Sequence, residues 1–94
     1  MESRQDFIDE EYVAPVGKME TSVAAIIADV LGVDRIGRTD SYYDFGGTSL
    51  QAIRICTRVE GQLGVKAVPL WLFENDVLED FVRRLTEPAE GAGD

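Results

Sequence analysis

The residues with the clearest chemical potential are Gly46, Gly47, Thr48 and Ser49, where a primary hydroxyl follows two adjacent glycines. Glycine allows sharp backbone turns, and the apolar pattern beyond this point predicts a helix that begins at about Ser49. Free backbone N–H groups and the helix dipole favour an anion at such an N-terminus, so the hydroxyl could carry an attached anionic group. The alternative is that Ser49 only caps the helix, the usual role of a serine at this place.

Ser49 is a poor candidate for a catalytic nucleophile. The chain has no histidine, which excludes a Ser-His-Asp arrangement. The nucleophile elbow of hydrolases has glycine two residues after the serine, whereas Leu50 and Gln51 follow here. A Ser–Lys pair with Lys18 or Lys66 has no spacing in its favour. We therefore expect that this protein is not an enzyme.

The charge of the chain narrows its possible partners. Eighteen acidic residues against nine basic ones give a net charge of −9. This charge opposes a nucleic-acid backbone, so we expect no nucleic-acid partner. It favours encounter with basic protein surfaces, although the simpler interpretation is that it keeps the protein soluble.

Length and cysteine content indicate a single domain without disulfide bonds. A chain of 94 residues, 45% hydrophobic, supports a single modest core. Its single cysteine, Cys56, cannot form an internal disulfide and lies on an apolar stripe, so we expect a buried thiol. The sequence has neither a Cys/His cluster nor the ligand spacing of a calcium loop, so we expect no metal site. Without a signal-like N-terminus or an apolar run of membrane-spanning length, we expect a cytoplasmic protein with no membrane contact.

The apolar periodicity predicts an all-α fold, a small four-helix bundle of three main helices and one short helix. A long loop separates the first two helices, and we expect its apolar side chains to pin it to the core. Asp40 and Asp44 in this loop are expected to hold turns, with help to a cation-dependent modification as the alternative. An Asp76–Glu79 pair resembles a capping box for the last helix. The helices are expected at residues 18–31, 49–63, 70–73 and 76–85, and the pinning side chains are Val33, Ile36, Tyr42, Tyr43 and Phe45.

The second predicted helix has two faces of different character. One stripe is apolar and is assigned to the core. A second stripe, nearly opposite to it, also contains apolar residues, Leu50 and Ile53. Such residues away from the core suggest a contact with another protein, unless Leu50 folds back under the loop. Trp71 is expected in or near the core, with partner contact as the alternative. The core stripe is Ala52, Ile55, Cys56, Val59 and Leu63, and the second stripe is Leu50, Ile53, Arg54 and Thr57.

Residues 40–50 (DSYYDFGGTSL) resemble the phosphopantetheine attachment site of peptidyl carrier proteins in nonribosomal peptide synthesis. The resemblance covers about three quarters of the chain in the right order. It includes the entry segment YVAP at residues 12–15, VLGV at 30–33, and the third-helix region PLWLFEN at 69–75. It implies a carrier domain at residues 17–86, between a flexible acidic leader at 1–16 and a flexible tail at 87–94.

The resemblance also implies a function for Ser49. In that family the serine receives 4′-phosphopantetheine from coenzyme A through a separate Mg²⁺-dependent transferase, and the thiol of the arm carries an aminoacyl or peptidyl thioester. Gly46, Gly47 and Thr48 would support the attachment. The implied partners are a phosphopantetheinyl transferase, an adenylation enzyme and condensation or tailoring enzymes, which a monomeric carrier meets in turn. Leu50, Ile53, Arg54, Thr57 and Trp71 are the candidate docking residues.

The sequence also departs from the family pattern. Thr48 stands where many peptidyl carriers have histidine or aspartate, and the third-helix region is one residue shorter and contains the unusual Trp71. The alternatives are an acyl carrier protein of polyketide or fatty acid type, or an unmodified acidic interaction domain. The initial Met1 favours a free-standing carrier over a domain excised from a larger synthetase.

Overall fold

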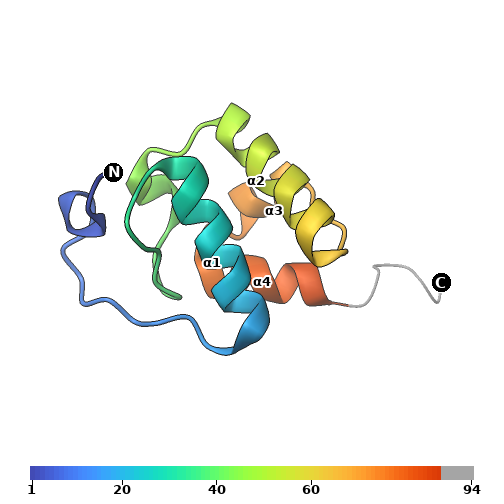
Figure 1. The fold of residues 1–94 in the computed structure, drawn as a ribbon, viewed down its shortest axis with the longest axis horizontal. Helices are drawn as coiled ribbons and strands as arrows, with labels where there is room; N and C mark the ends of the chain where they lie inside the picture. Colours follow the sequence, from blue (N-terminus) through green and yellow to red (C-terminus); the bar gives the residue numbers. More distant parts are fainter. Residues whose placement is uncertain (88–94) are drawn as a thin grey trace.

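The computed structural model describes residues 1–87 as an all-α bundle, as predicted (Figure 1). Within these residues there is no strand, only the isolated bridges Glu2–Val33 and Ser41–Val77. Two short 3-10 helices, η1 (Arg4–Asp6) and η2 (Tyr42–Phe45), accompany the four α-helices. The α-helices are α1 (Gly17–Leu31), α2 (Ser49–Leu63), α3 (Pro69–Glu74) and α4 (Leu78–Thr86).

The helix ends follow local chemistry. Gly32 and Gly64 end α1 and α2 with φ of 75° and 69°, a left-handed conformation that costs glycine little. Pro69 is suited to the first turn of α3, where no N–H is required. The predicted start of the last helix is wrong, because α4 begins at Leu78 without a side-chain cap. Asp76 instead accepts a hydrogen bond from the Ser41 hydroxyl, and this contact holds the long loop.

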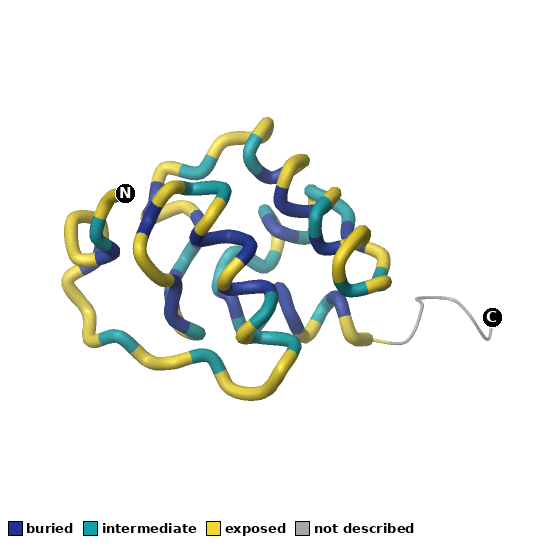
Figure 2. Tube along the Cα trace, viewed as in Figure 1, coloured by how far each residue is buried: buried dark blue, intermediate teal, exposed yellow. Residues whose placement is uncertain are grey.

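The core lies where α1 packs against both α2 and α4, and α3 lies between α2 and α4 and contacts both (Figure 2). The loop side chains Val33, Ile36, Tyr42 and Phe45 are buried in it, as predicted. Tyr43 was wrongly expected to be buried: it is 51% exposed, and its hydroxyl donates to the Phe73 carbonyl at 2.6 Å. The helix residues buried in this core include Val23, Ile26 and Ile27 of α1, Ala52, Ile55, Cys56 and Val59 of α2, Leu72 of α3, and Leu78, Phe81, Val82 and Leu85 of α4.

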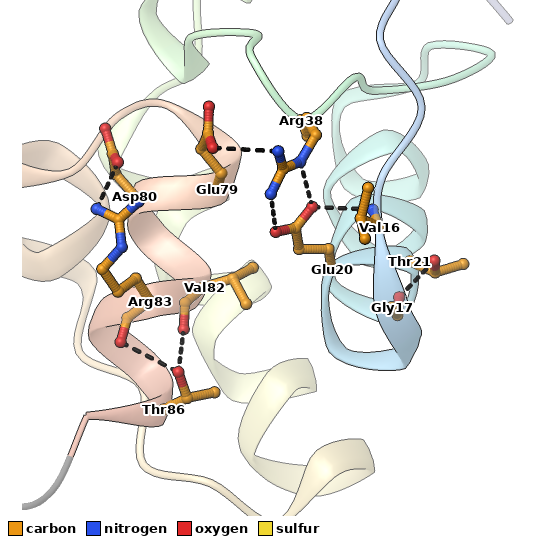
Figure 3. Close-up of polar contacts among 10 residues, drawn as sticks. All are labelled: Val16, Gly17, Glu20, Thr21, Arg38, Glu79, Asp80, Val82, Arg83 and Thr86. Carbon is orange, nitrogen blue, oxygen red and sulfur yellow. Dashed lines mark hydrogen bonds and ion pairs between the residues drawn. The ribbon is translucent and has the colours of Figure 1, made fainter.

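Arg38 links the long loop to both α1 and α4 (Figure 3). Its guanidinium donates twice to the Glu20 carboxylate, at 2.8 and 2.9 Å, and lies 3.5 Å from a Glu79 carboxylate oxygen. Glu20 also accepts the Val16 N–H at 2.9 Å. The hydrogen bonds from Arg38 lower the pKa of Glu20, so this carboxylate is charged in the fold and ties the loop to the start of α1.

The expectation of a flexible leader is wrong for residues 2–8, which we call the N-terminal strap. The strap lies against the long loop, where Glu2 exchanges two 2.8 Å backbone hydrogen bonds with Gly32 and Asp34. Arg4 is only 1% exposed and donates to both carboxylate oxygens of Asp40, at 2.6 and 2.8 Å. These contacts reach across 36 residues, so no local pattern could indicate them. Ile8 is buried beside them, and the Phe7 ring lies 5.5 Å from that of Phe45.

The predicted tail at residues 87–94 lies, apart from Glu87, outside the described residues. Among residues 1–87, no helix has the length and apolar character needed to cross a membrane.

Candidate functional site

Ser49 occupies the first turn of α2, with its side chain exposed at the end of the long loop. The alternative that Ser49 only caps the helix is wrong, because Thr48 is the N-cap. Thr48 Oγ1 accepts the Gln51 N–H at 3.2 Å, and Gln51 Oε1 accepts the Thr48 N–H at 3.0 Å, a complete capping box. The Ser49 hydroxyl is therefore not needed to cap α2 and is available for chemistry.

The two glycines before Ser49 are needed for different reasons. Gly46 has φ of 68°, in the left-handed region, and ends η2 by donating to the Tyr43 carbonyl at 3.0 Å. Gly47 does not have a positive φ. A Cβ atom at Gly47 would overlap the ring of Tyr42, which lies directly against its backbone. Gly46 therefore provides the turn, and Gly47 allows the loop to lie flat on a buried aromatic ring.

The loop that carries Ser49 is anchored to the junction between α3 and α4. The Tyr42 N–H donates to the Asp76 carbonyl at 2.7 Å, and the Leu78 N–H donates to the Asp40 carbonyl at 3.1 Å. The Asp40 carboxylate accepts the Gly37 N–H at 2.7 Å in addition to the Arg4 guanidinium, which confirms that it holds a turn. Asp44 is exposed. The described residues contain no cluster of three or more acidic, His or Cys side chains that could hold a metal.

The second face of α2 is exposed, as the sequence indicated. Leu50 is 58% and Ile53 is 51% exposed, so the alternative that Leu50 folds back under the loop is wrong. Arg54 and Thr57 are also exposed. Ile53, Arg54 and Thr57 border an open hollow of about 430 Å³ between α1 and α2. Leu70 of α3, which was not among the predicted docking residues, is as exposed as Leu50.

Trp71 packs at the edge of the core, and Cys56 lies inside it. Trp71 is half-buried on α3, not on the exposed face of α2, and the Arg84 guanidinium lies 3.8 Å from its ring centroid. Cys56 is buried as predicted, and burial raises the pKa of its thiol to about 11. A thiol in this environment stays protonated at neutral pH and is a poor nucleophile.

Comparisons with known proteins identify a family for this chain. The family described as "Phosphopantetheine attachment site" matches residues 21–85. The chain is similar to malpinin synthetase of Mortierella alpina, with 38% identity over 79 residues, and to tyrocidine synthase 2 of Brevibacillus parabrevis, with 34% identity over 76 residues. The first alignment covers 84% of this chain and 1% of the relative, and the second covers 81% and 2%. The chain therefore spans a very small part of these curated proteins.

Two solved structures have the same fold. One is a peptidyl carrier protein in complex with the phosphopantetheine transferase Sfp and coenzyme A, with a TM-score of 0.73 and 30% identity, covering 79% of this chain and 96% of that one. The other is the PaxA T1-CDD/PaxB NDD docking domain complex of the Pax synthetase, with a TM-score of 0.75 and 31% identity, covering 83% and 75% of the two chains. With an exposed serine at the start of α2, within the segment that the family match includes, the chain belongs to the phosphopantetheine attachment site family and is a peptidyl carrier protein.

Proposed function

We propose that Ser49 is the residue that accepts 4′-phosphopantetheine, and that the chain carries an aminoacyl or peptidyl group between the enzymes of nonribosomal peptide synthesis. The observation that carries this proposal is an exposed hydroxyl in the first turn of a 15-residue helix whose N-cap is already supplied by Thr48. A hydroxyl with no structural duty at that place can be modified without loss of the helix cap.

The residues around Ser49 fit a phosphodiester. The first turn of α2 has no acidic side chain to repel a phosphate, and its N–H groups and dipole favour an anion. Gly46 and Gly47 have no side chains that would crowd the substrate. When bound, the arm supplies a terminal thiol that holds the acyl group as a thioester.

Ser49 Oγ forms the new bond, to the phosphorus of the phosphopantetheine phosphate in coenzyme A. The bond from that phosphorus to the bridging oxygen breaks, and adenosine 3′,5′-bisphosphate leaves with the electron pair. The hydroxyl proton goes to a base of the transferase, because this chain has no histidine to receive it. The carrier therefore supplies the acceptor atom and its placement, and the transferase supplies the acid–base chemistry and the Mg²⁺.

The docking surface proposed for these enzymes is the exposed face of α2. Leu50 and Ile53 offer apolar contacts beside the acceptor, and Arg54 and Thr57 add polar groups at its edge. Trp71 is a separate candidate on α3. The transferase, an adenylation enzyme and condensation or tailoring enzymes would use this surface in turn, with the carrier as a monomer in the cytoplasm. A small patch suits successive partners, because each must leave before the next binds.

Intact-mass measurement tests the proposal. The chain is incubated with coenzyme A, Mg²⁺ and a phosphopantetheinyl transferase of broad specificity, and we expect a gain of one phosphopantetheinyl group. Ser49→Ala is expected to abolish the gain, and the control Ser22→Ala on α1 to retain it. A chain that gains no mass, or a Ser49→Ala variant that still gains it, would contradict the proposal.

A further inference from the structure

Tyr42 occupies a place in the attachment loop that the proposed function does not by itself require. Its side chain is only 3% exposed, and its ring packs edge-on against Phe73 with centroids 6.1 Å apart. The ring also lies against the backbone of Gly47, so closely that any larger residue there would overlap it. The ring is therefore a fixed support beneath the two residues that precede Ser49.

The hydroxyl of Tyr42 makes a specific contact at the end of this support. It donates to the Thr48 carbonyl at 2.7 Å, and the same carbonyl accepts the Ala52 N–H at 3.0 Å as the first hydrogen bond of α2. Burial raises the pKa of Tyr42 to about 12, so its hydroxyl keeps its proton and remains a donor throughout the neutral range. Two donors, one from the loop and one from the helix, fix the direction of one carbonyl.

The direction of that carbonyl determines the direction of Ser49. The Thr48 carbonyl and the Ser49 N–H belong to one planar peptide unit, and the described residues contain no cis peptide bond. In a trans unit the N–H points opposite to the C=O. The Cα of Ser49 is bonded to the nitrogen of this plane, on the same side of the C–N bond as the carbonyl oxygen. The two hydrogen bonds to the Thr48 carbonyl therefore also fix the position from which the exposed Ser49 side chain leaves the backbone.

We infer that Tyr42 is a positioning residue for the modification of Ser49: its buried phenol holds the Thr48–Ser49 peptide so that the Ser49 hydroxyl is presented for attack on coenzyme A. The inference rests on the proposed function. It concerns the phenolic oxygen, because a phenylalanine would keep the packing against Gly47 and Phe73 and lose only the contact with Thr48.

The neighbouring Tyr43 provides a matched control. Its hydroxyl also donates to a backbone carbonyl, that of Phe73, at 2.6 Å. Tyr43→Phe therefore removes a hydrogen bond of the same chemistry, one residue away, without changing the peptide that precedes Ser49. A general effect of losing a phenolic hydrogen bond should appear in both variants, whereas positioning of Ser49 should appear only in Tyr42→Phe.

The experiment measures phosphopantetheine transfer to the full chain by intact mass at several carrier concentrations. For Tyr42→Phe we expect kcat to fall by about 3- to 10-fold with little change in KM, because a displaced nucleophile slows the chemical step more than docking. For Tyr43→Phe we expect kcat to stay at the wild-type value. An unchanged kcat in Tyr42→Phe, an equal fall in both variants, or a change in KM alone would overturn the inference.

Amide hydrogen exchange gives a second readout that does not depend on the transferase. In Tyr42→Phe the Ala52 amide should exchange several-fold faster, while amides in the middle of α4 keep their wild-type rates. A uniform acceleration across both helices would mean a general loss of stability and would overturn the inference. If the wild-type chain accepts no phosphopantetheine, the proposed function fails and the inference with it. If the wild type is modified and Tyr42→Phe behaves identically, only the inference fails.

Discussion

Removal of Arg4 tests whether the N-terminal strap is part of the fold. Arg4 and Asp40 are nearly inaccessible to solvent and share two hydrogen bonds of 2.6 and 2.8 Å. In Arg4→Met the Asp40 carboxylate would keep a single partner there, the Gly37 N–H. Removing one member of a buried ion pair costs about 3–5 kcal/mol, because the remaining charge is left without compensation.

The position of Arg4 on a terminal segment lowers this estimate. The strap can separate from the loop and admit water to Asp40, so the cost cannot exceed the free energy that binds the strap. The strap is held by two backbone hydrogen bonds of Glu2 and by buried Ile8. We therefore expect Arg4→Met to lower the free energy of unfolding by an amount near the lower end of that range, about 3 kcal/mol. A domain of this length has a free energy of unfolding of about 5–14 kcal/mol, so the loss is a large fraction of the whole.

Urea denaturation followed by fluorescence measures this loss, because the single tryptophan, Trp71, is half-buried against Arg84. The matched control is Gln5→Met, an exposed neighbour on the same strap, which should change the free energy of unfolding by less than about 0.5 kcal/mol. The double variant Arg4→Met/Asp40→Asn should be more stable than Arg4→Met alone, because no charge is left buried without a partner. A loss in Arg4→Met no larger than in Gln5→Met, or a double variant less stable than Arg4→Met, would refute this reasoning.

Three further predictions concern the docking face, the loop and the core. Ile53→Asp should lower kcat/KM for phosphopantetheine transfer by about 10-fold or more, mainly through a higher KM, because burying an isoleucine against a partner is worth about 2 kcal/mol. The control is Gln62→Asp, at another exposed position of α2. An equal loss of kcat/KM in both variants would contradict a specific docking surface. Glu20 has a pKa lowered mainly by its hydrogen bond from Arg38, so its stabilising effect is present above about pH 4.5 and is lost as pH falls through the folded pKa. Glu20→Gln should therefore lower the urea midpoint at pH 7, and its difference from the wild type should shrink steadily as the pH falls below about 4.5; a difference that does not change with pH would exclude this origin. Cys56 should react with a disulfide reagent at pH 8 only as fast as the core opens, whereas rapid reaction of the native chain would contradict its burial and raised pKa.

The periodic elements of the fold could be predicted because their signals are local. The apolar spacing located α1 and α2 to within about a residue, and Gly32, Gly64 and Pro69 marked ends because each has a backbone property that other residues lack. The exposed face of α2 was predictable for the same reason, since the period of a helix assigns Leu50 and Ile53 to a direction away from the core.

The details around the proposed acceptor could not be predicted in the same way. Thr48 and Ser49 are both good capping residues, and the choice between them depends on where the preceding loop ends its turn. Tyr42 and Tyr43 are identical in type and adjacent, yet one lies under Gly47 in the core and the other is exposed on Phe73. Which of two equal aromatic residues faces inward is decided by the path of the loop.

By itself, the sequence determined the class of fold, the serine proposed as the acceptor and the second face of α2, which is exposed. Each of these depends on residue types within a few positions of one another. Only the tertiary structure decided that the strap packs on the loop, that Arg4 neutralises Asp40 and that the Tyr42 hydroxyl holds the peptide before Ser49. These contacts depend on packing: Arg4 and Asp40 meet across 36 residues, and two adjacent tyrosines are distinguished only by which one the loop turns toward the core.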